Sequence, residues 1–303
     1  MGVNTVIDFS SKKDIFIRNP DGSLSRMDEP YFDSEEIAPG TWKILSSGDY
    51  SYLLEGDDKA IAIDTGYGAG NIRQYLQSLT RKPLSEVINT HDHFDHTANN
   101  AYFDRAYMSE KTLPLATIPF ASFDGIDFHP DEYERVVVKE GDVIDLGGRA
   151  LEIFEVADHA VGSIIILDRK EKLLFTGDEF MTMGKHLKVS IDTWSGYMKK
   201  LAAYRNEFDR LCGGFGVAGA DLFDSFLACT DKIMSGNEGK RCEGPQKPKF
   251  PLEKDKEGHI IYDRRLPHPG DGGAGSEEPM TDPMILEYAG THIIYDRALN
   301  KEG

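Results

Sequence analysis

The sequence has few cysteines, a shortage of basic residues and no long apolar run. Only three of its 303 residues are cysteines, and none forms a Cys-x-x-Cys pair, which argues against a disulfide framework or a cysteine zinc site and predicts a reducing, cytoplasmic location. Lys and Arg number 34 against 52 Asp and Glu, a net charge of −18, so we expect no nucleic-acid partner. No run approaches about 18 apolar residues and no secretory signal opens the chain, so no membrane association is expected.

The remaining composition is typical of a globular protein, with 40% apolar and 28% charged residues. Residues 1–40 are polar and turn-rich, and residues 237–283 are rich in Pro, Gly, Lys and Glu. We therefore predict an N-terminal extension over residues 1–40, a main domain over 41–236 and a C-terminal extension over 237–303.

The main domain alternates between apolar runs and helical patterns. Strands are predicted within residues 41–48, 50–56, 59–66, 86–90, 135–139, 150–157, 163–168 and 172–178. Several are nearly continuous apolar runs, which is typical of strands buried on both faces. Helices are predicted over 71–79, from a cap at Asp192 or Thr193 along an apolar stripe that reaches Leu211, and over 220–236.

A six-residue sequence occurs twice near the end of the chain. His-Ile-Ile-Tyr-Asp-Arg stands at residues 259–264 and again at 292–297, 33 residues later. Two copies are too few for a solenoid. We expect a pair of edge strands, joined to each other or across a homodimer.

The strongest chemical signal lies at residues 91–96, which read His-Asp-His-Phe-Asp-His. Three histidines and a carboxylate this close together are hard to explain as core packing, because each imidazole would need its own buried partner. A solvated histidine loop is the alternative. Imidazole nitrogens and carboxylate oxygens are ligands for a divalent ion such as zinc, so the stretch predicts a metal site.

Two later residues extend the cluster. His159 lies between two strands that look buried, and Asp178 ends the strand Leu-Leu-Phe-Thr-Gly-Asp. Each alone would be an ordinary turn residue, but together with residues 91–96 they become candidate third and bridging ligands.

These motifs, with the upstream Ala-Ile-Asp-Thr-Gly that contains Asp64, resemble the metallo-β-lactamase-fold hydrolases, in particular the motif set of lactonases and glyoxalase II. The resemblance covers roughly residues 40–236. It implies an α/β fold, a four-layer αββα sandwich of two mixed β-sheets flanked by helices, with metals at the edge where the strand-end loops meet.

The resemblance also implies roles for the individual residues. One ion would be held by His91, His93 and His159; the second would take Asp95 and His96, with Asp178 bridging the two. Zinc is the expected metal, as one or two ions, with iron or manganese as alternatives. Asp95 is the expected catalytic residue, which orients hydroxide formed from metal-bound water and passes a proton to the leaving group.

One position departs from the family pattern. Family members usually complete the second site with a histidine in a Pro-x-His-Gly-like turn after the helix that follows the bridging aspartate. In the matching stretch, residues 211–216, Phe215 stands there instead. Three outcomes are open: a weakly bound second ion, a substitute histidine, or loss of activity. His186 is the first candidate substitute and His268 the second, although an ordinary surface role is the simpler explanation of either residue.

The predicted function is a metal-dependent hydrolase that attacks the ester-like carbonyl of a small molecule, which is an ester, lactone or thioester. Trp194 and Tyr197 are candidates to line the substrate pocket, with core packing as the simpler explanation. Two rival functions stay open. One is a di-iron or mixed-metal redox enzyme on the same scaffold, and the other is a non-catalytic module that binds metal or ligand.

Overall fold

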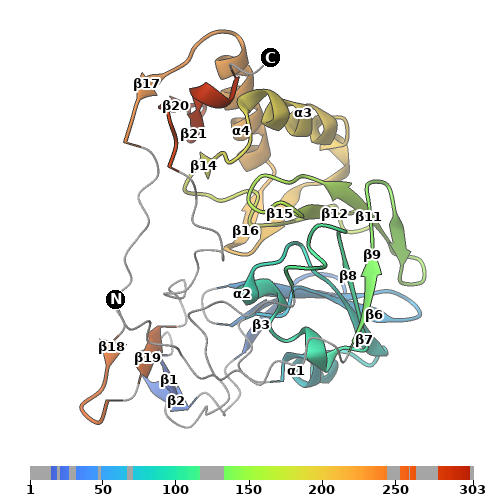
Figure 1. Ribbon diagram of the computed structural model, residues 1–303. Coiled ribbons are helices and arrows are strands. Elements are labelled where there is room, and N and C mark those ends of the chain that lie inside the picture. Colours follow the sequence, from blue (N-terminus) through green and yellow to red (C-terminus); the bar gives the residue numbers. More distant parts are fainter. Residues whose placement is uncertain are drawn as a thin grey trace.

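The structure is a computed structural model, and it describes residues 15–18, 21–26, 32–46, 49–66, 71–116, 133–243, 253–258, 260–263 and 279–300. Figure 1 shows two large sheets stacked in the centre of the molecule, with helices on their outer sides. None of the helices in these ranges combines the length and apolarity that crossing a bilayer requires.

The first large sheet has seven strands in the order β3-β4-β5-β6-β7-β8-β9. Its strands are β3 (Asp33–Ala38), β4 (Thr41–Leu45), β5 (Tyr50–Glu55), β6 (Ala60–Ile63), β7 (Leu84–Ile88), β8 (Arg105–Met108) and β9 (Glu134–Val137). The pairs from β3 to β6 are antiparallel and those from β6 to β9 are parallel. The carboxyl ends of β6 and β7 therefore meet at one edge of the sheet, where Asp64 and the histidine motif begin.

The second large sheet has six strands in the order β10-β11-β12-β13-β15-β16. They are β10 (Val143–Asp145), β11 (Ala150–Glu155), β12 (Ile164–Asp168), β13 (Leu173–Gly177), β15 (Arg210–Gly213) and β16 (Gly216–Gly219). Only β13 and β15 run parallel. All eight strands expected from the sequence are present in the two sheets.

Three apolar layers hold the stack together. The central layer joins the facing sides of the two sheets, through residues such as Ile63 and Phe175. A second covers the outer side of the first sheet under α1 (Ile72–Leu79), and a third covers the outer side of the second sheet under α3 (Ile191–Ala202) and α4 (Asp221–Met234). Each fully buried aliphatic or aromatic side chain contributes about 1.5–3 kcal/mol. The predicted αββα sandwich is confirmed.

The predicted helix over residues 192–211 was wrong at both ends. It begins after the cap Ser190, whose hydroxyl accepts a hydrogen bond from the Thr193 backbone N–H, and it ends at Ala202. Leu211 lies in β15, where its backbone pairs with Leu174 of β13. The apolar stripe continued past the helix because both segments bury side chains in the same layer. The helices at 71–79 and 220–236 are confirmed as α1 and α4.

The two copies of the repeat form strands in separate small sheets. The first copy contributes β19 (Ile260–Asp263), in the order β18-β19-β1-β2 with β18 (Glu253–Lys254), β1 (Ile15–Arg18) and β2 (Leu24–Arg26). The second contributes β21 (Thr291–Asp296), in the order β14-β21-β20-β17 with β14 (Lys185–His186), β20 (Pro283–Tyr288) and β17 (Lys240–Arg241). The expectation of edge strands paired with each other was wrong, because each copy lies inside its sheet.

The β20–β21 hairpin packs on the main domain. Ile293 and Tyr295 are buried in the apolar layer beneath α3 and α4.

The described chain also contains three short 3-10 helices: η1 (Asn100–Tyr102), η2 (Arg205–Glu207) and η3 (Arg297–Asn300). The division at residues 40 and 236 stays a prediction, although the first boundary falls inside the β3–β4 hairpin.

Candidate metal centre

The histidine motif spans the loop after β7 and most of the short helix α2 (Phe94–Thr97), which carries Asp95 and His96, at the edge where the two large sheets meet (Figure 1). The buried side chain of Asn89 holds this loop in shape. Its amide nitrogen donates to the backbone oxygen of His96 at 3.0 Å and to Asn100 Oδ1 at 3.0 Å. The backbone N–H of Thr65 also donates to the His96 oxygen, at 2.9 Å. The loop is therefore anchored from two neighbouring strand ends.

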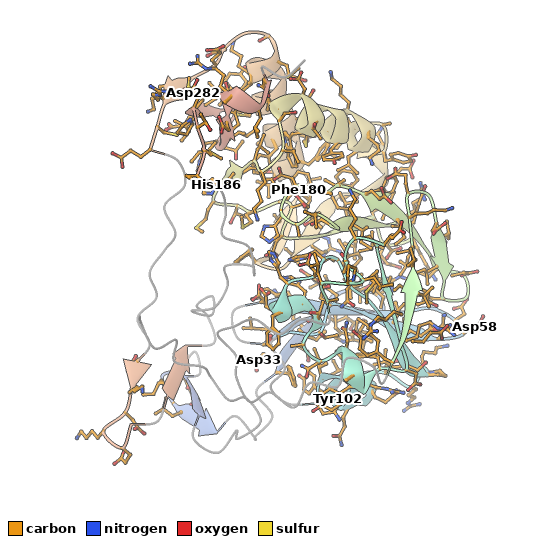
Figure 2. All side chains as sticks on the ribbon, viewed as in Figure 1. Asp33, Asp58, Tyr102, Phe180, His186 and Asp282 are labelled. Carbon is orange, nitrogen blue, oxygen red and sulfur yellow. The ribbon has the colours of Figure 1, made fainter. Side chains whose placement is uncertain are left out.

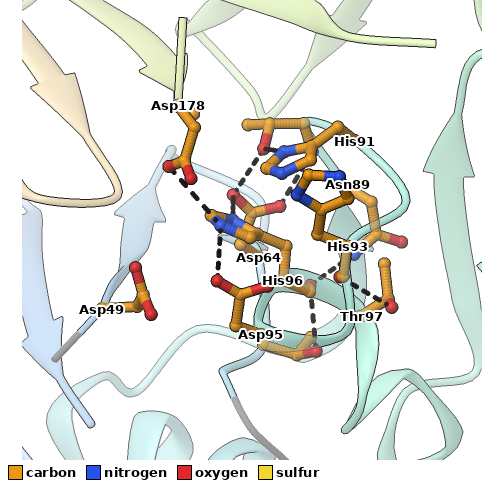
Figure 3. A network of polar contacts seen from close by, with 12 residues as sticks. Asp49, Asp64, Asn89, His91, His93, Asp95, His96, Thr97 and Asp178 are labelled. Atoms are coloured by element: carbon orange, nitrogen blue, oxygen red, sulfur yellow. Dashed lines mark hydrogen bonds and ion pairs between the residues drawn. The ribbon is translucent and has the colours of Figure 1, made fainter. Parts of the chain in front are cut away.

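The structure brings all six predicted ligands together. The ligand atoms of His91, His93 and His159 lie within 4.8 Å of one another, and so do those of His91, His96 and Asp178. Asp178 also approaches the first group: its Oδ2 lies 3.6 Å from His159 Nε2, while its Oδ1 lies 3.5 Å from His96 Nε2. Asp95 joins the second group through Oδ2, 3.5 Å from the same His96 nitrogen (Figure 3).

Several atoms that face the centre of this cluster have no hydrogen-bond partner within the described residues. They are His91 Nε2, His96 Nε2 and Asp178 Oδ1, on side chains that are at most 4% exposed. Buried polar atoms without partners are costly and rare. Because the three are a lone-pair nitrogen or a carboxylate oxygen, a divalent cation would satisfy them, and the residues present fit a metal centre.

Asp64 orients two of these histidines. Its Oδ2 accepts from Thr90 Oγ1 at 2.7 Å and lies 2.8 Å from His96 Nδ1, while Thr90 Oγ1 lies 3.0 Å from His91 Nδ1. If the hydroxyl donates to Asp64, both imidazoles carry their proton on Nδ1 and leave Nε2 as the free lone pair. Asp64 holds this place with a left-handed backbone, φ 59°, a conformation that aspartate tolerates better than most residues.

Replacing Asp64 with asparagine is expected to lower metal affinity about 10–100-fold. The new amide donor would face His96 Nδ1 and favour the proton on Nε2, which blocks ligation. Competition with a chromogenic chelator measures the affinity. Asp58→Asn, at an exposed position far from the centre (Figure 2), is the control. An unchanged affinity in the Asp64 variant would show that the carboxylate does not set the histidine tautomers.

The electrostatics of the cluster favour neutral imidazoles in the first group. Burial and the neighbouring histidines hold the pKa of His91 and of His159 well below the usual range. In the second group, burial opposes charge, yet Asp95, Asp64 and Asp178 together raise the pKa of His96 well above its usual value. A cation that binds at His96 Nε2 therefore displaces a proton from that nitrogen. Burial likewise opposes ionisation of Asp95, but the adjacent His96 lowers its pKa to about 2. Asp95 is therefore a carboxylate at neutral pH.

A buried charge cluster, which the sequence did not predict, supports the ligand loops. Lys185 Nζ lies 2.7 Å from Asp158 Oδ2 and 2.7 Å from Glu179 Oε2, and all three side chains are at most 2% exposed. Glu179 Oε1 accepts from the backbone N–H of His159 at 2.8 Å. Asp158 and Glu179 are each adjacent in the chain to a ligand, so this cluster fixes both loops that meet residues 91–96.

The turn that carries Phe215 approaches the centre with its backbone. At Gly214, a Cβ atom would overlap Asp178 Oδ1 and crowd His96 Cε1. The Phe215 side chain is 41% exposed and lines a small cavity with Phe180 and Leu222. Phe215 therefore contributes no ligand, as its chemistry requires.

The first candidate substitute, His186, is not brought to the centre. His186 lies exposed on β14, beside the C-terminal strands (Figure 2), with its ring 6.4 Å from that of His292. Among the described residues, the groups able to hold a metal do not include it, so this prediction was wrong. His268 lies outside the described residues. A carboxylate oxygen of Asp49 instead lies within 4.8 Å of the ligand atoms of Asp95 and His96, and no sequence pattern had marked Asp49.

A cavity of about 510 Å³ adjoins the loop that carries His159. Its lining includes Ala157, Val161 and Gly162 of that loop together with Tyr197 of α3. Of the two aromatic residues proposed for the substrate pocket, Tyr197 reaches this cavity. Trp194 is fully buried instead, and its indole N–H donates to Thr230 Oγ1 at 3.1 Å.

The αββα sandwich and the six side chains gathered at its strand ends define a fold with a candidate metal centre. The family model described as Metallo-beta-lactamase superfamily matches residues 48–212, more than half of the chain. The chain therefore belongs to the metallo-β-lactamase superfamily. A metallo-beta-lactamase from Pontibacter korlensis has a similar structure, with a TM-score of 0.53 at 17% identity over 66% of this chain and 99% of that one.

Several curated relatives are similar to part of the chain. Human acyl-coenzyme A thioesterase MBLAC2 is 30% identical over 158 aligned residues, and the match covers 42% of this chain and 56% of that protein. A hydroxyacylglutathione hydrolase of Ruegeria pomeroyi is 30% identical over 175 residues, 55% of this chain and 62% of that one. The 2,4-dinitroanisole O-demethylase subunit alpha of a Nocardioides species is 28% identical over 177 residues, and the match covers 56% of this chain and 53% of that protein. These matches span little more than half the length of each relative.

Proposed function

We propose that this protein is a metal-dependent hydrolase of small-molecule thioesters. The observation that carries the proposal is the convergence of four imidazoles and two carboxylates on one buried point, with Asp178 between the two ligand groups. Two relatives support the choice of thioester, because the names of both, an acyl-coenzyme A thioesterase and a hydroxyacylglutathione hydrolase, describe thioester cleavage.

In this proposal His91, His93 and His159 hold one ion, Asp95 and His96 belong to the second position, and Asp178 is shared. Divalent ions in such a site supply Lewis acidity and lower the pKa of bound water towards neutrality. Three neutral imidazoles suit zinc. Carboxylate-rich surroundings at the second position also accept iron or manganese.

The side chains of the chain itself handle the proton. Hydrolysis joins the water oxygen to the carbonyl carbon and breaks the C–S bond, so one proton must pass from water to the departing sulfur. Asp95 is ionised and 7% exposed, and its carboxylate is the base proposed to orient the water, accept this proton and release it to the thiolate. Asp64 keeps the imidazoles in the orientation that this arrangement needs.

A substrate panel with verified metal content tests the proposal. Purified protein is assayed with an acyl-coenzyme A, an acylglutathione, an aryl ester, a lactone and an aryl methyl ether. We expect the highest kcat/KM for a thioester, loss of turnover on chelation and recovery when zinc or manganese is added. Higher kcat/KM for the ester or lactone would refute the substrate class. Turnover of none of them by metal-loaded protein, or bound iron with a visible absorption band and redox activity, would refute the hydrolase.

A pair of histidine variants tests the ligand assignment. His93→Ala is expected to lose the ion of the first group and to lower turnover at least 100-fold, because the group of three imidazoles loses a member. His186→Ala changes an exposed histidine outside the centre and is expected to keep wild-type metal content and kcat/KM. Equal metal content in the two variants would contradict the assignment of His93.

A further inference from the structure

The missing histidine leaves open which residue completes the second metal position, and the structure offers a carboxylate there. Asp49 immediately precedes β5, at the end of the turn that follows β4. Its side chain is 2% exposed, and a carboxylate oxygen lies within 4.8 Å of the ligand atoms of both Asp95 and His96. Figure 3 shows Asp49 facing Asp95 and Asp178 from across the centre, on a different strand from every predicted ligand.

The backbone around Asp49 is fixed from two sides. Its carbonyl oxygen accepts from the Ser46 backbone N–H at 3.0 Å, which closes the turn. The next residue, Tyr50, donates its backbone N–H to the oxygen of Gly214 at 2.8 Å. Two residues on, Tyr52 donates its hydroxyl to the oxygen of Gly213 at 2.6 Å. The start of β5 is therefore tied to the turn that would carry the usual histidine.

The hydrogen bonds between the start of β5 and the turn after β15 explain how Asp49 can take the place of the usual histidine. Gly214 lies against Asp178 and His96 with no room for a side chain, and the Phe215 side chain lines a separate cavity with Phe180 and Leu222. The turn after β15 thus closes this side of the centre without a donor atom. Next to this turn, which the Tyr50 backbone N–H holds through Gly214, the fold presents the carboxylate of Asp49 to Asp95 and His96.

We propose that Asp49 is the closing protein ligand of the second metal position, in place of the histidine usual in the family. This inference rests on the metal centre of the proposed function. The second position then has three carboxylates, Asp49, Asp95 and Asp178, and one imidazole, His96, whose Nε2 has no hydrogen-bond partner among the described residues. Oxygen-rich sets favour harder ions such as Mn²⁺, whereas the three imidazoles of the first position favour zinc.

Manganese titration measures the second position directly. Protein loaded with one equivalent of zinc is titrated with Mn²⁺, and free Mn²⁺ is followed by its electron paramagnetic resonance signal. Wild-type protein is expected to bind one Mn²⁺ per chain while its zinc is retained, as total metal analysis would show. Asp49→Asn is expected to weaken Mn²⁺ binding at least 10-fold and to keep the zinc. Asp58→Asn, an exposed position, is expected to match the wild type.

The outcomes separate this inference from the proposed function. Wild-type Mn²⁺ affinity in Asp49→Asn, or a wild-type chain that binds a single ion, would overturn the role of Asp49 while leaving a thioesterase with other ligands standing. Absence of thioester turnover with both ions bound would refute the function and leave Asp49 a ligand. Binding of no ion at all would refute both.

A measurement without a substitution covers the case in which Asp49→Asn fails to fold. A crystal structure of the zinc- and manganese-loaded wild type, recorded at the manganese absorption edge, locates the second ion. A manganese ion within about 2.3 Å of an Asp49 carboxylate oxygen, as for other carboxylate ligands, supports the proposal. A separation beyond about 4 Å overturns it.

Discussion

Replacement of Asp178 with alanine is expected to empty both metal positions and to lower kcat/KM for thioester hydrolysis by about 10³-fold or more, which corresponds to about 4 kcal/mol of transition-state stabilisation. Asp178 is the ligand that the two metal positions are proposed to share. Its two oxygens lie 3.5 Å from His96 Nε2 and 3.6 Å from His159 Nε2. Metal content per chain and steady-state kinetics on the same preparation measure the two effects.

The control for Asp178 is a matched aspartate on the surface. Asp209 has a 65% exposed side chain and pairs with Lys172 at 3.6 Å, and Asp209→Ala should leave both metal content and kcat/KM unchanged. If Asp178→Ala retained two ions per chain, the bridging role would be wrong. Loss of activity with full metal content would instead give Asp178 a part in substrate binding.

Replacement of Lys185 with methionine is expected to lower the free energy of unfolding by about 3–5 kcal/mol, because it leaves two buried carboxylates without a cation. Lys185 lies 2.7 Å from both Asp158 and Glu179, and its ammonium also lies 4.8 Å from the centre of the Trp194 ring. Metal affinity should fall as well, because Lys185 holds Glu179, and Glu179 accepts a hydrogen bond from the backbone N–H of the candidate ligand His159. Urea denaturation of the metal-free protein measures the first effect.

Two variants test the cause of this loss. Lys200→Met removes a half-buried lysine that pairs with Glu140 at 2.8 Å, and it should cost less than about 1 kcal/mol, as surface pairs do. A triple variant with Lys185→Met, Asp158→Asn and Glu179→Gln removes the uncompensated charge and should recover part of the lost stability. A Lys185→Met protein as stable as the wild type would show that the two carboxylates find another partner or take up protons at little cost.

Local patterns in the sequence predicted the strands, the helices and the candidate ligands, and the family resemblance that these support implied the layers of the fold and the ligand groups. Strands buried on both faces are visible as continuous apolar runs, and ligands at strand ends converge because the carboxyl ends of β6 and β7 lie side by side. His91, which follows β7, and Asp178, which follows β13, could be predicted from sequence as candidate ligands. The family resemblance rests in part on these two residues. Family comparison alone could not say how the site accommodates Phe215.

The features that were not predicted depend on contacts between distant segments. Asp49 is an ordinary turn residue until β5 is tied to Gly214, which is 165 residues further along the chain. Lys185 is an ordinary charged residue until it meets Asp158 and Glu179. Leu211 continues an apolar stripe of helical spacing, but its pairing with β13 makes it part of a strand. In each case tertiary contacts, rather than local propensity, decide the outcome.

The β20–β21 hairpin has a consequence for how the molecule comes apart. Leu187, two residues after Lys185, donates its backbone N–H to Ile294 at 2.8 Å, and Lys185 itself pairs in register with Ile293. A chain shortened at Gly236 would expose the apolar underside of α4 and deprive β14 of its neighbour. We therefore expect the cooperative unfolding unit to extend beyond the stretch matched by the family model. Cleavage within β21 would also loosen β14, and with it Lys185 and Glu179, which hold the His159 loop.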